Sequence, residues 1–147
     1  MKRRPISKLL LPRVMILAVL VINLQCALAF IVNPLAYAAS FELVGEPGRA
    51  AVIGIGILFL MWQVPYVFAL LHPKKNYRSL VEAVLMQAIG LVGEWFLLRS
   101  VPAANTMLRG AILRFVLFDA AGLLLLLLAG LFTHHFIKSD FGETHAD

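Results

Sequence analysis

Residues 111–132 read AILRFVLFDAAGLLLLLLAGLF, an apolar stretch with six leucines in a row at positions 123–128. A helix of about 20 apolar residues is long enough to cross the hydrocarbon core of a bilayer, which is about 30 Å thick. Because an unpaired backbone group in lipid is costly, the stretch is expected to be helical throughout. Residues 111–132 therefore predict a membrane-spanning helix.

Three further stretches of this kind precede it, near residues 14–32, 50–71 and 80–98. Over all 147 residues, 61% are hydrophobic and 14% are charged. Soluble domains average about 45–50% apolar and about 25% charged residues. A short chain cannot bury such an excess inside itself, so much of it must face lipid. The predicted fold class is an all-α, polytopic membrane four-helix bundle, formed by residues 1–147 as a single transmembrane domain.

The distribution of basic residues predicts the orientation of the bundle. Nine of the 13 lysines and arginines lie before the first stretch, between the second and third, or after the fourth: Lys2, Arg3, Arg4, Lys8, Arg13, Lys74, Lys75, Arg78 and Lys138. Since basic residues are enriched in cytoplasmic segments, both termini are predicted to be cytoplasmic (N-in, C-in) in a multi-pass protein of the plasma or inner membrane. Aromatic rings favour the headgroup region, so Tyr66 is expected at the inner interface.

The first stretch also allows an alternative, a cleaved signal peptide. A basic start and an apolar run are followed by Ala27-Leu28-Ala29, which resembles a small-residue cleavage site. The apolar run continues through Val32, however, and this continuation favours an uncleaved helix. Cys26, the single cysteine, allows no disulfide within the chain.

Polar side chains occur inside all four stretches. An ionisable residue at membrane depth is costly, so it usually faces the interior of a bundle and marks a site. In the third stretch, Gln87 and Glu94 share one helical face with Ala83 and Gly90. The remaining candidates for an intramembrane polar site are, in chain order, Asn23, Gln63, Arg114 and Asp119.

The rise of about 1.5 Å per residue suggests how these groups pair. Glu94 and Arg114 lie at similar depths, so an ion pair between the third and fourth stretches is expected. Asp119 lies nearer the membrane centre, where Gln87, Asn23 or Gln63 could hydrogen-bond to it. For the two acids, a pathway or pocket for a proton, ion or small polar ligand and a purely structural role both stay open. For the amides, contacts that hold helices together are favoured.

No cofactor or metal is predicted. His72 and His135 end the second and fourth stretches on the same predicted side and are the only candidate ligands, but no spacing motif supports them. Arg78 and Glu82, four residues apart, are expected to pair on a helix surface. The basic residues form no continuous face, so nucleic acid is not an expected partner, whereas the lipid bilayer is.

The first half of the chain resembles the DoxX-like group of small four-helix membrane proteins. The resemblance rests on the Asn33-Pro34 end of the first stretch, on the loop Gly45-Glu46-Pro47-Gly48-Arg49, and on a glycine-bearing second stretch that ends at His72-Pro73. It is architectural, so it implies a fold and no functional residues.

Three functions are compatible with the sequence. The chain is small, has short loops and lacks catalytic motifs, which favours a non-enzymatic accessory protein or subunit of a membrane complex, as a homo-oligomer or with another membrane protein. The acids Glu94 and Asp119 suggest an alternative, a small proton-coupled transporter. A membrane-embedded enzyme acting on a lipid or quinone, with one of these acids as general acid or base, is the third.

Overall fold

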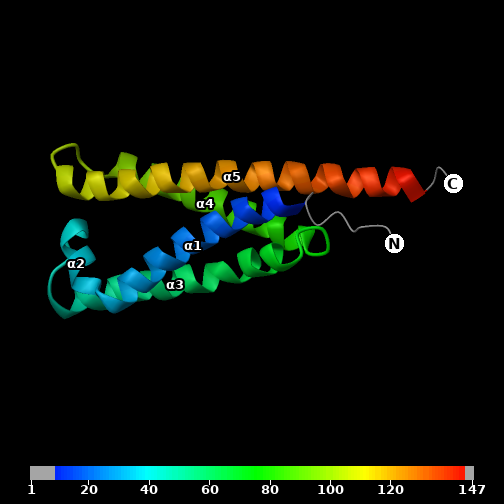
Figure 1. Cartoon of the computed structure of the whole chain (residues 1–147). Coiled ribbons are helices and arrows are strands. Elements are labelled where there is room, and N and C mark those ends of the chain that lie inside the picture. The colour runs from blue at the N-terminus through cyan, green and yellow to red at the C-terminus, as the bar shows by residue number, and fades with distance from the viewer. Residues whose placement is uncertain (1–8, 145–147) are drawn as a thin grey trace.

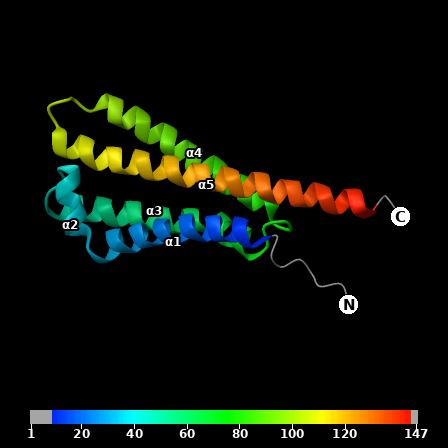
Figure 2. The same cartoon turned by 45° about the horizontal axis from the view of Figure 1, so that its top comes forward.

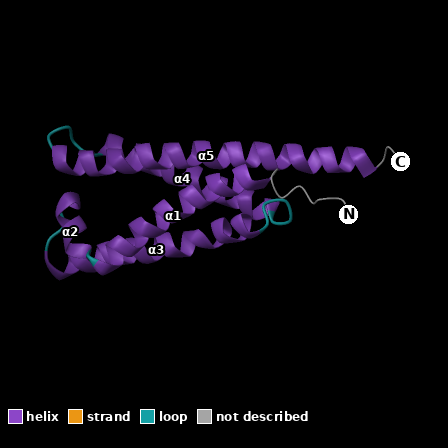
Figure 3. Ribbon diagram, in the orientation of Figure 1, coloured by secondary structure: helices purple, strands orange, loops and turns teal. Residues whose placement is uncertain are grey.

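The computed structural model describes residues 9–144, and the side chains of residues 9–139. The described part is helical and contains no strand (Figure 3). Its elements are α1 (Leu10–Val32), α2 (Pro34–Ala38), the 3-10 helix η2 (Ala39–Phe41), α3 (Gly45–Leu71), α4 (Tyr77–Ser100) and α5 (Thr106–Thr144). The four long helices are long and apolar enough to cross a membrane. The predicted all-α membrane four-helix bundle is therefore confirmed.

Each long helix extends beyond the stretch that predicts it. The largest difference is at α5, which continues from residue 132 to Thr144. Helical hydrogen bonding needs no apolar side chains outside lipid, so a hydropathy window marks only the part of a helix inside the membrane. The segment between the first two spans is also not a plain loop, because it forms α2 and η2. Pro34 begins α2, where its missing N–H removes no helical hydrogen bond.

The four long helices are arranged as two pairs, α1 with α3 and α4 with α5 (Figure 1). The pairs lie close together at the turn between α3 and α4 and diverge toward the end that holds α2, as a second view also shows (Figure 2). α1 begins and α5 ends at the end of the bundle that holds the α3–α4 turn. The side of the membrane on which this end lies stays a prediction. Four of the basic residues behind that prediction, Lys2, Arg3, Arg4 and Lys8, lie outside the described residues.

Gly56 sets the distance between α1 and α3. A Cβ atom at Gly56 would lie 2.9 Å from the Ala27 carbonyl oxygen and 3.1 Å from the Phe30 Cβ. Real Cβ atoms essentially never come within 3.0 Å of another heavy atom. Only glycine therefore permits the two backbones to approach this closely, as small residues commonly do between membrane helices.

Apolar side chains form a core at each end of the bundle. The turn-side core, near the α3–α4 turn, consists of Ile16, Val19, Leu20, Tyr66, Ala69, Leu80, Ala83, Leu126 and Ala129. The aromatic cluster, near α2, consists of Phe30, Phe41, Phe59 and Phe115, whose ring centroids lie about 6 Å apart. The Tyr66 side chain is 1% exposed, so its ring points into the bundle and does not face the headgroup region. The depth of Tyr66 in the membrane stays a prediction. Its hydroxyl group has partners inside the bundle and so does not need the headgroup region.

Two arginines bind main-chain carbonyl groups where helices end. Arg109 donates from Nη1 to the carbonyls of Leu98 (2.8 Å) and Val101 (2.7 Å), and so caps α4. Arg13 donates to the carbonyl of Leu71 at 2.9 Å and so caps α3. The last carbonyls of a helix have no partner within it, so both arginines satisfy groups that would otherwise need water.

The predicted surface pair on α4 is also present. Arg78 Nε lies 3.6 Å from Glu82 Oε1, and both side chains are largely exposed. Glu82 therefore belongs to the surface of the bundle.

Candidate functional site

A chain of hydrogen bonds links α3, α4 and α5 in the middle of the bundle. The Tyr66 hydroxyl group lies 2.5 Å from Gln87 Oε1 and donates to it. Gln87 Nε2 donates in turn to Asp119 Oδ1 at 2.8 Å. Gln87 is 4% exposed, and both ends of its amide are used. The expected hydrogen bond between Gln87 and Asp119 is thus present, and it fixes the position of one carboxylate oxygen.

Two glycines make room for the polar side chains of this chain. A Cβ atom at Gly90 on α4 would lie 2.6 Å from Asp119 Oδ2, and one at Gly122 on α5 would lie 2.9 Å from Gln87 Nε2. Gln87 lies three positions before Gly90 on α4 and contacts Gly122 of α5. Asp119 lies three positions before Gly122 on α5 and contacts Gly90 of α4. The two helices are antiparallel, so the contacts are reciprocal. A larger residue at Gly90 would displace Asp119, and one at Gly122 would displace Gln87.

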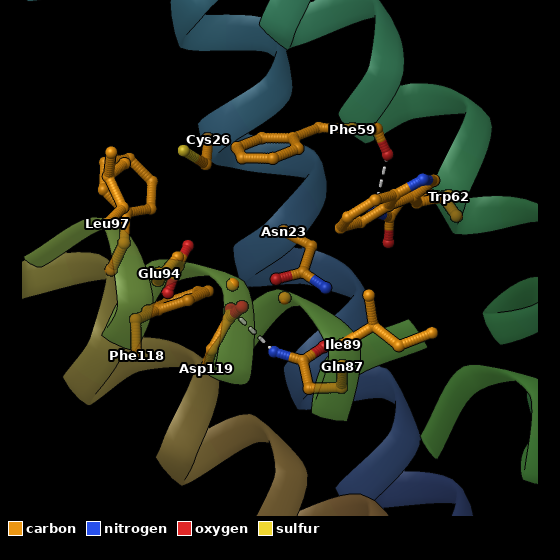
Figure 4. A pocket seen from close by; sticks show the side chains of 14 residues that line it. Asn23, Cys26, Phe59, Trp62, Gln87, Ile89, Glu94, Leu97, Phe118 and Asp119 are labelled. Carbon is orange, nitrogen blue, oxygen red and sulfur yellow. Dashed lines mark hydrogen bonds between the residues drawn. The ribbon is translucent and has the colours of Figure 1, made fainter. Parts of the chain in front are cut away.

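A cavity of about 310 Å³ lies between the two helix pairs, next to this chain of hydrogen bonds. All four long helices contribute to its lining, which consists of Asn23, Cys26, Phe59, Trp62, Gln63, Gln87, Ile89, Gly90, Gly93, Glu94, Leu97, Phe115, Phe118 and Asp119. Figure 4 shows the carboxyl groups of Glu94 and Asp119 and the amides of Asn23 and Gln87 around one space, with the ring of Trp62 on the opposite side. Five of the six candidates from the sequence meet here: Asn23, Gln63, Gln87, Glu94 and Asp119.

Two buried polar atoms at the cavity have no hydrogen-bond partner among the described residues. They are Glu94 Oε2 and Gln63 Oε1. The Gln63 amide uses its other end, because Nε2 donates to the carbonyl of Phe59 at 2.8 Å within α3. A buried acceptor without a donor loses its hydration and gains nothing in return. A ligand, water or ion that donates to these oxygens would satisfy both of them.

The predicted ion pair between Glu94 and Arg114 is wrong. Within residues 9–139, Arg114 makes no ion pair and its side chain is exposed. It lies instead beside a hollow formed by Cys26, Phe30 and Tyr37. The prediction compared the depths of Glu94 and Arg114 in the membrane but did not consider the direction in which each side chain points around its helix. Arg114 lies five positions before Asp119, a rotation of about 500° at 3.6 residues per turn, so the two side chains point about 140° apart.

Sequence reasoning missed three aromatic residues of α3. Phe59 and Trp62 line the cavity, and Tyr66 begins the chain of hydrogen bonds. A signal was present, because Phe59, Gln63 and Tyr66 are spaced by four and three residues and so share a helical face. In an apolar span this pattern is hard to recognise, since aromatic residues occur on lipid-facing surfaces as well.

Two of the histidines pack against aromatic rings at the end of α5. The rings of His134 and Tyr77 have centroids 5.9 Å apart, and His135 packs against Phe136. His72 ends α3. In the part of the chain that the structure describes, no group of three or more potential metal ligands is present.

Comparisons with known proteins identify no relative. No protein-family model, no curated protein and no solved structure matches the chain. The resemblance to the DoxX-like group therefore stays a prediction, and the function must be inferred from the cavity itself.

Proposed function

We propose that the protein is a small membrane carrier that binds its ligand in the cavity between the helix pairs, with Glu94 and Asp119 exchanging a proton for the ligand. The convergence of both acids on one cavity of about 310 Å³ carries this proposal. Asp119 lies near the middle of the span Thr106–Ser139. An acid at that depth is costly, and with a purely structural role both carboxyl groups would be expected to be fully paired. Glu94 Oε2 instead lies unpaired beside free space.

The packing of the helices supports a carrier in a second way. α1 and α3 touch at Gly56, and α4 and α5 touch at Gly90 and Gly122, so each pair is closely packed within itself. Between the pairs lie the cavity and the rings of the aromatic cluster. Carriers commonly work by rocking one half of the molecule against the other around a central site. The α1–α3 pair and the α4–α5 pair are suited to be these halves.

Coupling to protons follows from the chemistry of a carboxyl group. A protonated carboxyl group has no charge with which to attract a cationic group, whereas a carboxylate does. Proton and ligand therefore compete for Glu94 and Asp119, and the loss of one favours the binding of the other. Gln87 holds Asp119 Oδ1 in place during this exchange, because it donates to that oxygen.

The proposal is tested by measuring proton flux in proteoliposomes that contain a pH-sensitive dye, with a gradient of guanidinium, a small permanent cation, as the driving force for exchange. We expect the protein to speed the change in internal pH, and Glu94→Gln and Asp119→Asn to abolish this effect. Glu82→Gln is the matched control, since Glu82 is an acid of the same helix that faces away from the cavity and pairs with Arg78. It is expected to keep the flux. Circular dichroism and gel filtration check that all variants fold.

Unchanged flux in both cavity variants would contradict the carrier. The interpretation that the sequence favours, a non-enzymatic accessory protein or subunit of a membrane complex, would then be preferred. Its own test is extraction in mild detergent followed by native mass spectrometry, where a stable partner is expected. The third interpretation, an enzyme acting on a lipid or quinone, predicts a changed lipid species when the gene is removed.

A further inference from the structure

Among the described residues, the two buried polar atoms without a partner at the cavity are a carboxylate oxygen and an amide oxygen, which both accept hydrogen bonds. Glu94 Oε2 and Gln63 Oε1 have no partner among the described residues. Gln63 is 7% exposed, so bulk water does not reach its amide freely. Buried acceptors are satisfied only by donors. A ligand that completes this site must therefore bring N–H or O–H groups.

The acidic residues at the cavity indicate what charge the donor group of a ligand carries. Asp119 Oδ1 accepts from Gln87, and Oδ2 lies on the side of Gly90, which also lines the cavity. The lining includes two acids and no lysine, arginine or histidine. Two carboxyl groups without a basic partner in a largely apolar site favour a ligand with positive charge. An ammonium group satisfies both conditions, because it carries a charge and several N–H donors.

The rest of the lining suits an apolar or aromatic body. Four aromatic rings face the cavity, those of Phe59, Trp62, Phe115 and Phe118. Phe59 and Trp62 have centroids 6.1 Å apart, so together they form one continuous aromatic wall. Aromatic faces bind apolar groups and also attract ammonium groups. The cavity thus has an acidic side and an aromatic side.

Access to the cavity is from the side of the bundle. Along the helix axes, the cavity lies between the turn-side core and the aromatic cluster. Trp62, Ile89 and Leu97 line the cavity and are also exposed on the outside of the bundle. In a membrane, these three residues of α3 and α4 face lipid. A ligand therefore enters from the bilayer between α3 and α4, and must be soluble in lipid.

We infer that the cavity binds a protonated amine on an apolar body, preferably an aromatic one, which enters from the lipid between α3 and α4. Glu94 and Asp119 hold the ammonium group, Gln63 Oε1 accepts one of its N–H groups, and the ring of Trp62 packs on the apolar body. The inference rests on the proposed function, since it names the ligand of the same cavity. Binding, however, is measured without any transport.

The test compares three probes of similar size and different charge. They are 2-phenylethylamine, a cation at neutral pH; propylbenzene, its uncharged counterpart; and 3-phenylpropionate, an anion. Binding to the full chain in nanodiscs is measured by titration calorimetry, with empty nanodiscs subtracted. We expect saturable binding of the amine, at least about tenfold tighter than that of either other probe. In Trp95→Phe, Trp62 is the one remaining tryptophan, and its fluorescence should change with the amine alone.

Two variants separate charge from shape. Glu94→Gln removes a charge at nearly constant volume and should weaken binding of the amine at least about tenfold. Gly93→Leu keeps both acids and fills the cavity, because Gly93 lines it and a Cβ atom there would meet nothing within 4 Å. It should abolish binding. Gly54→Leu is the matched control, since Gly54 is equally open and lies away from the cavity, and it should leave binding unchanged.

Each outcome decides a different claim. Equal binding of all three probes, no saturable binding of the amine, or unchanged binding in Gly93→Leu would overturn the inference. Proton flux that depends on Glu94 and Asp119 without amine binding would also overturn it and leave the carrier standing. Tight amine binding without such flux would support the ligand class and contradict the carrier.

Discussion

Gly90 and Gly93 of α4 provide a direct test of how closely Asp119 is held. Both are helical glycines on the same helix, so replacement by alanine brings the same gain in helix propensity, about 1 kcal/mol in aqueous helices. A Cβ atom at Gly90 would lie 2.6 Å from Asp119 Oδ2, whereas one at Gly93 would meet nothing within 4 Å. Gly90→Ala must therefore displace the carboxyl group, and Gly93→Ala need not.

The size of the effect follows from what the displacement breaks. The 2.8 Å hydrogen bond from Gln87 to Asp119 is lost or lengthened. Such bonds between membrane helices contribute about 0.6 kcal/mol on average and up to about 1.7 kcal/mol, and overpacking adds about 1–3 kcal/mol. We expect Gly90→Ala to be about 1.6–4.7 kcal/mol less stable than Gly93→Ala, because these two costs add and the propensity gain cancels in the comparison.

The assay is reversible unfolding in bicelles with added SDS, followed by circular dichroism. Both substitutions are then repeated in an Asp119→Ala background, where the carboxyl group is absent. There the difference between Gly90→Ala and Gly93→Ala should fall below about 0.5 kcal/mol, as for sites that do not interact. If the difference is the same in both backgrounds, Gly90 does not make room for Asp119, and the reasoning about the site is wrong.

Four further predictions concern the rest of the bundle. Tyr66→Phe should lower the free energy of unfolding by about 0.6–1.7 kcal/mol in the same assay, since it removes the donor to the buried amide of α4; no change would mean that the hydroxyl group is not engaged. Gly56→Ala should destabilise by about 1–3 kcal/mol because it forces α1 away from α3, whereas Gly54→Ala, with open space around it, should not; equal effects would contradict the close approach of these helices. Arg109→Ala should cost about 1–3 kcal/mol, because two main-chain carbonyls at the end of α4 lose their donor, while Arg114→Ala should stay within about 0.5 kcal/mol. A reporter enzyme that is active in the cytoplasm alone should be active when fused to the C-terminus, as the basic residues predict, and an inactive fusion would reverse the orientation.

The number and place of the spanning helices could be predicted from the sequence because lipid imposes a simple rule. Each apolar stretch must satisfy its own backbone hydrogen bonds, so residues 14–32, 50–71, 80–98 and 111–132 had to be helical whatever their neighbours were. Periodicity on one helix was equally informative. It placed Gln87 and Glu94 on one face of α4, and both line the cavity.

Which side chains of different helices contact each other could not be predicted in this way. Depth along the membrane suggested that Arg114 pairs with Glu94, but the rotation of α5 turns Arg114 outward and Asp119 inward. The ring of Tyr66 was expected to face the headgroup region, because nothing in the sequence says that Gln87 of another helix would meet its hydroxyl group.

Composition and periodicity thus determined that the chain is a bundle of four membrane-spanning helices with polar groups inside it, because those properties depend on each segment and on its solvent alone. Only the tertiary structure decided that the acids are not neutralised by an arginine and that they share a cavity with an aromatic wall. The physical reason is that close approach depends on how glycines of different helices meet. Gly56, Gly90 and Gly122 set those contacts, and the space left between the two pairs became the site.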